Sequence, residues 1–242
     1  MANETGDMKI TGNFRRLIDL VAADALYQPS NNVLRLSNLE ARLAAAISSV
    51  NDIGVKIAPS KFAINARQEA YTEAVSIVRG SRNILKASGA SEKTLEDADT
   101  FTRKVFGLRK SQKKTDDPNT PGNEAAASHS ASQLSYDAIL GNIRSYIQIV
   151  SNESLYTPNE AKYQPANLTT VADNLEAKNN AVSTAFVPLN NARNLRDDTL
   201  YSGTENICDL AAMVKAYVKA IHGATSQIYK TINALSFRRG VR

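Results

Sequence analysis

The chain reads GNFRRLIDLV at residues 12–21 and GNIRSYIQIV at residues 141–150, a repetition offset by 129 positions. At the same offset LYQP at 26–29 recurs as LYTP at 155–158. Further single matches in this register are Asn38 with Asn167, Pro59 with Pro188 and Arg67 with Arg196. One register that holds over some fifty residues predicts an internal duplication of the chain.

The register shifts further along the two copies. SGAS at 88–91 matches HGAT at 222–225 at an offset of 134 instead of 129. We therefore expect about five extra residues in the second copy, near residues 201–203.

Each copy has the pattern of four helices. Ile10, Phe14, Leu17 and Val21 are spaced by four, three and four positions, which is the apolar stripe of an amphipathic helix. The stripe passes through Gly12, so this glycine and its counterpart Gly141 are expected inside a helix, where a missing side chain lets a neighbouring backbone approach. The alternative is a helix that starts at a cap formed by Asn13 or Asn142.

The second helix of each copy is expected to stop at a proline, Pro59 or Pro188, because proline removes a helical hydrogen bond. Asn179 occupies the apolar stripe where the first copy has Val50. It either forms a polar contact that the first copy lacks or lies in solvent on a rotated helix. Gly89 and Gly223 are expected to end the third helix, and Ser91 or Thr225 to cap the last one.

A polar stretch separates the two copies. It contains Pro118 and Pro121 and has no apolar periodicity, which is typical of a flexible linker. The predicted fold is all-α, with two tandem, internally duplicated antiparallel four-helix bundles: residues 8–112, a linker over 113–133, and residues 134–242.

The composition excludes several classes of protein. With 242 residues, 43% hydrophobic and 22% charged, the chain is neither a disulfide miniprotein nor a disordered tail. The single cysteine, Cys208, allows no internal disulfide. The first ten residues are polar and no run of about 18 apolar residues occurs, so a cytoplasmic location without membrane contact is expected.

The residues needed for catalysis or metal binding are scarce. The only histidines are His129, in the linker, and His222, which we interpret as a residue of the last turn of a helix, where a protonated imidazole is favourable. No Glu-x-x-His and no glycine-rich phosphate loop occurs, and Cys208 has the surroundings of a small core residue. We therefore expect no enzyme, cofactor or metal.

The leading hypothesis is a structural or adaptor protein that binds other protein chains, including copies of itself. A function shared by both copies should use residues that occur in both. The candidates for a common interaction surface are Arg15 and Arg144, Tyr27 and Tyr156, and Arg67 and Arg196.

The alternative is a bundle that binds RNA or DNA through the basic end of each copy. The net charge of +5 is small, and cations near a helix C-terminus also complement the helix dipole without any ligand. The residues of this candidate basic patch are Arg16, Arg103, Lys104, Arg109, Lys110, Arg238 and Arg239.

Overall fold

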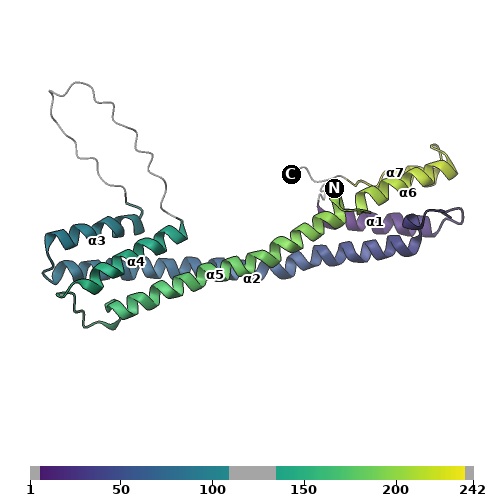
Figure 1. The fold of residues 1–242 in the computed structure, drawn as a ribbon. Coiled ribbons are helices and arrows are strands. Elements are labelled where there is room, and N and C mark those ends of the chain that lie inside the picture. The colour runs from purple at the N-terminus through teal and green to yellow at the C-terminus, as the bar shows by residue number, and fades with distance from the viewer. Residues whose placement is uncertain (1–5, 109–134, 238–242) are drawn as a thin grey trace, which may run out of the picture. The chain divides into compact units, whose positions relative to one another are not determined.

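A computed structural model describes residues 6–108 and 135–237, and every regular element in these ranges is helical, which confirms the all-α prediction (Figure 1). The first part contains α1 (Asp7–Ala22), a 3₁₀ turn (Asn32–Leu34), α2 (Leu36–Ala87) and α3 (Glu92–Val105). The second contains α4 (Tyr136–Asn152), a 3₁₀ turn (Ala161–Tyr163), α5 (Pro165–Asp197), a π turn (Asp198–Ser202), α6 (Ile207–His222) and α7 (Gln227–Asn233).

Four of the helices begin at side-chain caps. Ser91, Ser135, Asn206 and Ser226 each accept a hydrogen bond from the backbone N–H three residues later. The last cap is therefore Ser226 and not Thr225. Gly89 and Gly223 follow helix ends as expected, with φ of 82° and 81°, in the left-handed region that glycine adopts without strain.

The expectation that Pro59 and Pro188 end helices is wrong. Pro59 lies inside the 52-residue α2, and Pro188 lies inside the 33-residue α5. Both prolines are exposed, so water can satisfy the carbonyl that loses its helical partner. The rest of each helix is held by two apolar cores, whose burial outweighs the local cost of the proline.

Because α2 and α5 continue through their prolines, the chain divides in an unexpected way. Unit 1 consists of Met1–Lys61 and Ala185–Arg242, and unit 2 consists of Phe62–Thr184. Each unit thus combines parts of both predicted copies, and two successive bundles over 8–112 and 134–242 are not confirmed. The predicted linker over 113–133 lies outside the described residues.

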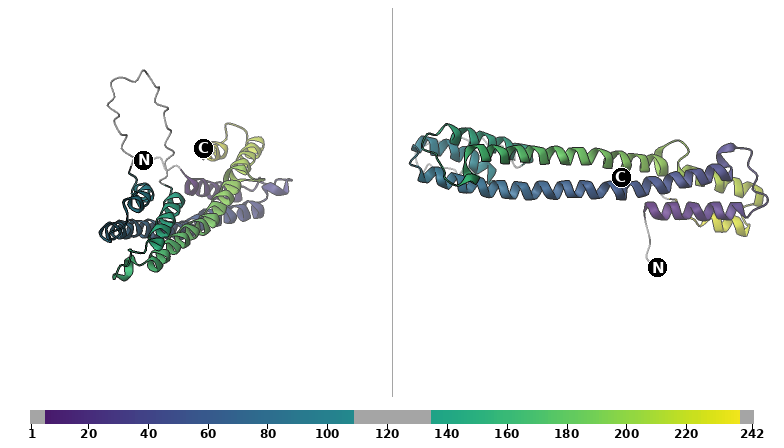
Figure 2. Two further views of the ribbon diagram at one scale, coloured as in Figure 1. Left: turned by 60° about the vertical axis from the view of Figure 1, so that its left-hand side comes forward. Right: turned by 90° about the horizontal axis from the view of Figure 1, so that it is seen from below.

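In unit 1, α1 packs against α6 and α7 (Figure 2). The predicted stripe of α1 is buried: Phe14 and Leu17 are fully inaccessible, and Ile10 and Val21 are nearly so. α6 contributes the opposing apolar face. Its buried residues are Ile207, Cys208, Leu210, Ala211, Val214 and Val218.

In unit 2, α3 lies against α4, and the C-terminal part of α2 and the N-terminal part of α5 complete the core (Figure 1). Its apolar cluster includes Tyr71, Val78, Leu85, Ile143, Tyr146, Leu168 and Leu175.

Local contacts recur in the two copies at the offset of 129 residues. The Tyr27 hydroxyl donates to the carbonyl of Leu34 over 2.8 Å, and the Tyr156 hydroxyl donates to the carbonyl of Tyr163 over 2.8 Å. Gly12 and Gly141 lie inside α1 and α4 as preferred, but the reason given was wrong, since a Cβ at either position would meet no atom within 4 Å.

The second copy is interrupted where α2 is continuous. The π turn Asp198–Ser202 and a non-helical link separate α5 from α6, at the place where the extra residues are expected. Glu205 in this link has a φ of 56°, which is unusual for a residue other than glycine. Gly203 is required here because a Cβ would lie 2.6 Å from the Asp198 carbonyl oxygen.

Candidate interaction surfaces

Arg15 and Arg144 are exposed in both copies, but their surroundings differ. Arg144 is 2.7 Å from Glu176 and 3.4 Å from Asp173 through its Nη2 atom. Arg15 forms no ion pair among the described residues. Arg144 also lines an open depression of about 330 Å³ on unit 2, whose floor includes the buried Ile147 and Ala172.

Tyr27 and Tyr156 are not part of an accessible surface. They are 6% and 4% exposed, and each hydroxyl is bonded to a backbone carbonyl. Burial raises the pKa of Tyr27 to about 12 and also raises the pKa of Tyr156. Both residues therefore fix the loop that follows the first helix of their copy.

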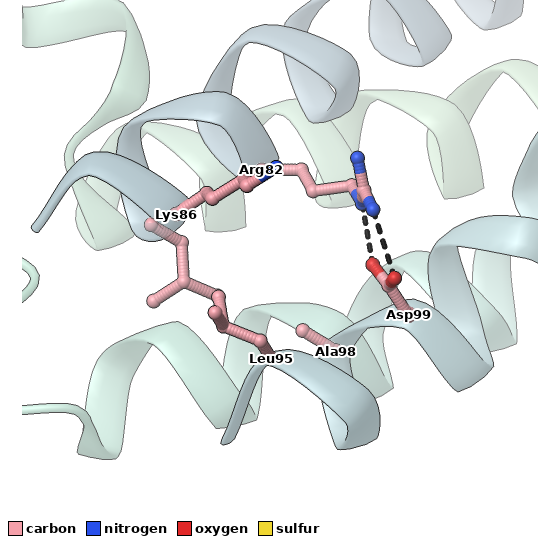
Figure 3. Close-up of a pocket in the computed structure, with 6 residues that line it drawn as sticks. Arg82, Lys86, Leu95, Ala98 and Asp99 are labelled. Atoms are coloured by element: carbon pink, nitrogen blue, oxygen red, sulfur yellow. Dashed lines mark hydrogen bonds and ion pairs between the residues drawn. The ribbon is translucent and has the colours of Figure 1, made fainter. Parts of the chain in front are cut away.

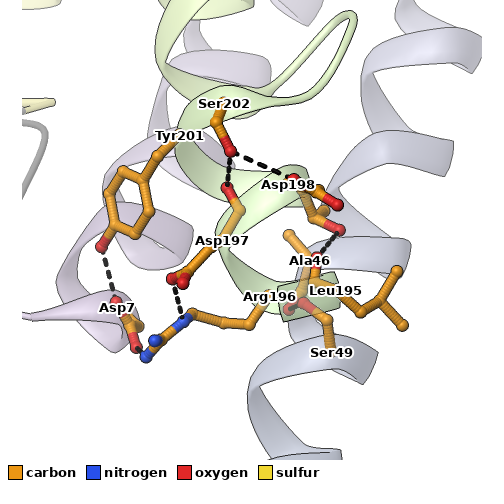
Figure 4. Close-up of polar contacts among 10 residues, drawn as sticks. Asp7, Ala46, Ser49, Leu195, Arg196, Asp197, Asp198, Tyr201 and Ser202 are labelled. Atoms are coloured by element: carbon orange, nitrogen blue, oxygen red, sulfur yellow. Dashed lines mark hydrogen bonds and ion pairs between the residues drawn. The ribbon is translucent and has the colours of Figure 1, made fainter. Parts of the chain in front are cut away.

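Arg196 belongs to a polar cluster inside unit 1 (Figure 4). Its Nη1 atom is 2.5 Å from Asp7 and its Nε atom is 2.8 Å from Asp197. The Tyr201 hydroxyl donates to the other oxygen of Asp7 over 2.5 Å. Burial, and then the bond to Asp7, raise the pKa of Tyr201, so it stays neutral and the cluster holds α1 to the end of α5.

Arg67 occupies the equivalent position in unit 2, where it meets an aromatic ring. Its guanidinium lies 3.9 Å from the centre of the Tyr136 ring, and the Tyr71 hydroxyl donates to the Tyr136 carbonyl over 2.9 Å. Asn179 donates to the Tyr71 hydroxyl and to Asp137, both over 2.9 Å. Of the two interpretations of Asn179, the polar contact absent from the first copy is therefore confirmed.

The candidate basic residues do not gather on one unit. Arg16 is an exposed residue of unit 1, whereas Arg103 and Lys104 belong to unit 2. Arg103 is 3.9 Å from Asp99, and Lys104 lies over the Phe101 ring. The remaining members of the patch, Arg109, Lys110, Arg238 and Arg239, lie outside the described residues.

A small pocket of about 130 Å³ lies between the end of α2 and α3 in unit 2 (Figure 3). The Arg82 guanidinium closes one side with two hydrogen bonds to Asp99, of 2.5 and 2.8 Å, while Leu85, Leu95 and Ala98 provide apolar walls. Hydrogen bonding to Arg82 lowers the pKa of Asp99, so the pair stays ionised at neutral pH. Because both charges are paired, the pocket has the character of a structural contact.

The residues considered for chemistry are structural. His222 is the last residue of α6, and its Nε2 atom lies 2.6 Å from an oxygen of Asp24, a partner that the sequence did not indicate. Cys208 is buried in the unit 1 core. Among the described residues no group of three or more metal-ligating side chains occurs. No helix in that part of the chain has the length and apolar character needed to cross a membrane.

The least covered parts of the helices flank the two prolines. We call residues 51–66 of α2 and 183–196 of α5 the proline stretches. Only Ser60 is buried in the first, and only Leu189 and Ala192 are buried in the second. These stretches nevertheless carry five of the ten large apolar side chains that are exposed in the described residues: Val55, Phe62, Phe186, Val187 and Leu195.

The sequence analysis missed the proline stretches because it assigned their apolar residues to helix seams. Val55 and Phe62 are seven residues apart, which places them on the same side of α2, and they are 64% and 72% exposed. A signal was present, since each stretch contains a proline in an otherwise continuous helical pattern.

The chain matches no protein-family model, no curated protein and no solved structure.

Proposed function

We propose that the protein is a non-catalytic helical protein that binds other protein chains, and that the proline stretches are its binding surfaces. The observation that carries the proposal is the exposure of Val55 and Phe62 on one side of α2. Large apolar side chains grouped on an accessible surface are typical of protein contacts, because their burial against a partner stabilises a complex.

The polar content of the units supports this proposal over a catalytic one. The ionisable side chains with shifted pKa values are held in contacts that join helices: Asp99 with Arg82 in unit 2, and Tyr201 with Asp7 in unit 1. Neither pair is aimed at an open cleft that would admit a substrate. A surface for protein binding needs no such cleft.

We also propose that the chain is an internal duplication whose two copies occupy equivalent roles. Recurring contacts support it, namely the tyrosine bonds of Tyr27 and Tyr156 and the pairing of position 67 or 196 with position 136 or 7. Equivalent copies offer two related surfaces, so a partner with two equivalent sites would gain avidity.

The nucleic-acid alternative has less support. Unit 1 contains 15 basic and 10 acidic residues, and unit 2 contains 14 of each, so the whole excess of positive charge belongs to unit 1. A dedicated nucleic-acid surface usually has a denser group of cations.

The test places a photo-activated cross-linking amino acid at Phe62 in the full chain, in the native host. The matched control places it at Glu69, which is exposed on the same helix without an apolar neighbour of this kind. We expect a discrete protein adduct at Phe62 and none at Glu69. Equal labelling at both positions would overturn the proposal, and an adduct with nucleic acid at Phe62 would favour the alternative.

A further inference from the structure

We infer that the two copies are binding partners of one another, and that a buried chain of hydroxyl groups from Ser81, Tyr146 and Tyr156 makes each copy pair with the other in preference to itself. The inference rests on the internal duplication proposed above. It concerns the seam inside each unit, whereas the proposed function concerns the exposed proline stretches.

The side-chain contacts that close unit 1 join residues of different copies. Asp7, Asp24 and Arg42 of the first copy pair with Arg196, His222 and Glu205 of the second. The rings of Tyr27 and Tyr217 meet edge to face with their centres 5.3 Å apart. Unit 1 therefore exists only when both copies contribute to it.

Unit 2 is built in the same way. α3 of the first copy packs on α4 of the second, and Tyr71 and Arg67 of α2 contact Tyr136. The first copy thus supplies one side of both cores and the second copy supplies the other. This arrangement is that of a dimer whose two subunits have been joined into one chain.

Ser81 lies at the centre of the unit 2 seam and is fully buried. Its hydroxyl is 2.7 Å from the Tyr146 hydroxyl and 2.6 Å from the Tyr156 hydroxyl. Tyr156 uses its proton for the Tyr163 carbonyl, so it accepts from Ser81. Ser81 has then spent its only proton and accepts from Tyr146. Every hydroxyl in the chain donates once, and no other arrangement of the protons satisfies all three.

Neither copy can reproduce this chain of bonds with itself. At the offset of 129 residues, the first copy has Leu17 where the second has Tyr146, so Ser81 in a pair of first copies would face a leucine. The buried face of α6 contains aliphatic residues and Cys208 but no hydroxyl, so in a pair of second copies Tyr146 would be buried without its partner. A buried polar group without a partner disfavours the complex that contains it.

The first experiment separates the copies without changing their surfaces. A recognition sequence for a site-specific protease is inserted between Thr120 and Pro121 of the full chain, and the purified protein is cleaved. We expect the two fragments to elute together at the mass of the intact chain. Fragments that separate as folded monomers would show that each copy forms its own bundle, which would overturn the inference. The cross-linking result at Phe62 is independent of this outcome.

The second experiment tests the hydroxyl chain in the cleaved protein. Ser81→Ala leaves the Tyr146 hydroxyl without a partner, and we expect it to weaken the affinity of the fragments about tenfold. The matched control is Ser49→Ala, because Ser49 is equally buried in α2 but bonds only to the carbonyl of Ala46 in its own helix. In Ser81→Ala with Tyr146→Phe, both partners are removed, and we expect the affinity to recover part of the loss. Equal effects of Ser81→Ala and Ser49→Ala would overturn the role of the hydroxyl chain.

The third experiment counts the pairs. The cleaved protein is unfolded, refolded as the mixture of fragments, and examined by native mass spectrometry, which separates the mixed pair from the two self-pairs by mass. We expect the mixed pair to exceed the self-pairs by about tenfold more than random association allows, and the excess to disappear in the double variant. A random mixture from the unaltered protein would overturn the preference.

Discussion

The two units place the same positions in contact but use different chemistry at them. Positions 7 and 136 are equivalent, as are positions 67 and 196. In unit 1, Arg196 forms an ion pair with Asp7, and in unit 2, Arg67 stacks on the ring of Tyr136. An arginine therefore has the same task in both units, which is to hold the start of the neighbouring copy's first helix. The ion pair loses strength in salt, whereas the stack depends mainly on close packing.

The centres of the two cores differ in the same manner. Leu17 and Tyr146 are equivalent and both fully buried, but only Tyr146 takes part in a chain of hydrogen bonds. Unit 1 is thus held by apolar contact at this place, and unit 2 by apolar contact and directed bonds together. The four predictions below use this difference between the units.

The largest effect is expected from Leu17→Ala. It removes a fully buried side chain from unit 1, and we expect a loss of about 2–5 kcal/mol in the free energy of unfolding. Hydrogen exchange should show lower protection in α1 and α6, with little change in α3 and α4, because Leu17 belongs to the unit 1 core. An equal loss of protection in both units would contradict their description as separate cores.

Gly203→Ala should destabilise the π turn of unit 1 by about 1–3 kcal/mol, since the new Cβ would press on the Asp198 carbonyl oxygen. Gly12→Ala is the matched control. It fills open space inside α1 and should stabilise the protein by about 0.5–1 kcal/mol. Urea unfolding measures both changes, and effects of the same sign would count against the crowding at Gly203.

Asn179→Val gives unit 2 the residue that stands at the equivalent position of unit 1. The free energy of unfolding should change by less than about 1 kcal/mol, because two hydrogen bonds are lost while a buried amide is removed. The pKa of Tyr71 is raised by burial and lowered by its bond from Asn179, so it should rise further in the variant. Selectively labelled tyrosine NMR measures this, and an unchanged Tyr71 titration would exclude the contact.

The smallest effect concerns acid stability. The pKa of Asp99 is lowered by its bonds to Arg82, so this contribution to stability is complete above the ordinary Asp value of about 4 and is lost as the pH falls through the lowered value. A partly exposed pair contributes at most about 1 kcal/mol. In Asp99→Asn the decline of unit 2 stability below about pH 4 should be shallower. The same acid decline as in the unaltered protein would exclude this role.

The sequence predicts much of the local structure, because local structure depends on nearby residues. The stripe of Phe14 and Leu17, the glycine at each helix end and the interruption near Gly203 all follow from spacing and from the shift in register. Asn179 also stood out, since it breaks an apolar pattern that the other copy keeps.

The assignment of helices to units could not be predicted. Each apolar stripe can be covered equally well by a helix of its own copy or of the other copy, so periodicity does not distinguish the two arrangements. The outcome depends on whether the chain turns at Pro59 and Pro188. A proline lowers helix stability locally, but the cores on both sides of it, which hold Leu39 and Leu85 of the same helix, decide the result.

The division of the chain has a consequence for its synthesis. Unit 2 is one continuous segment, Phe62–Thr184, so all of its helices have left the ribosome well before translation ends. Unit 1 needs α1 from the beginning of the chain and α6 and α7 from the end. The apolar face of α1 must therefore wait, uncovered, for most of the time the ribosome takes to make the protein. This nascent helix is the part of the molecule that a chaperone would protect first.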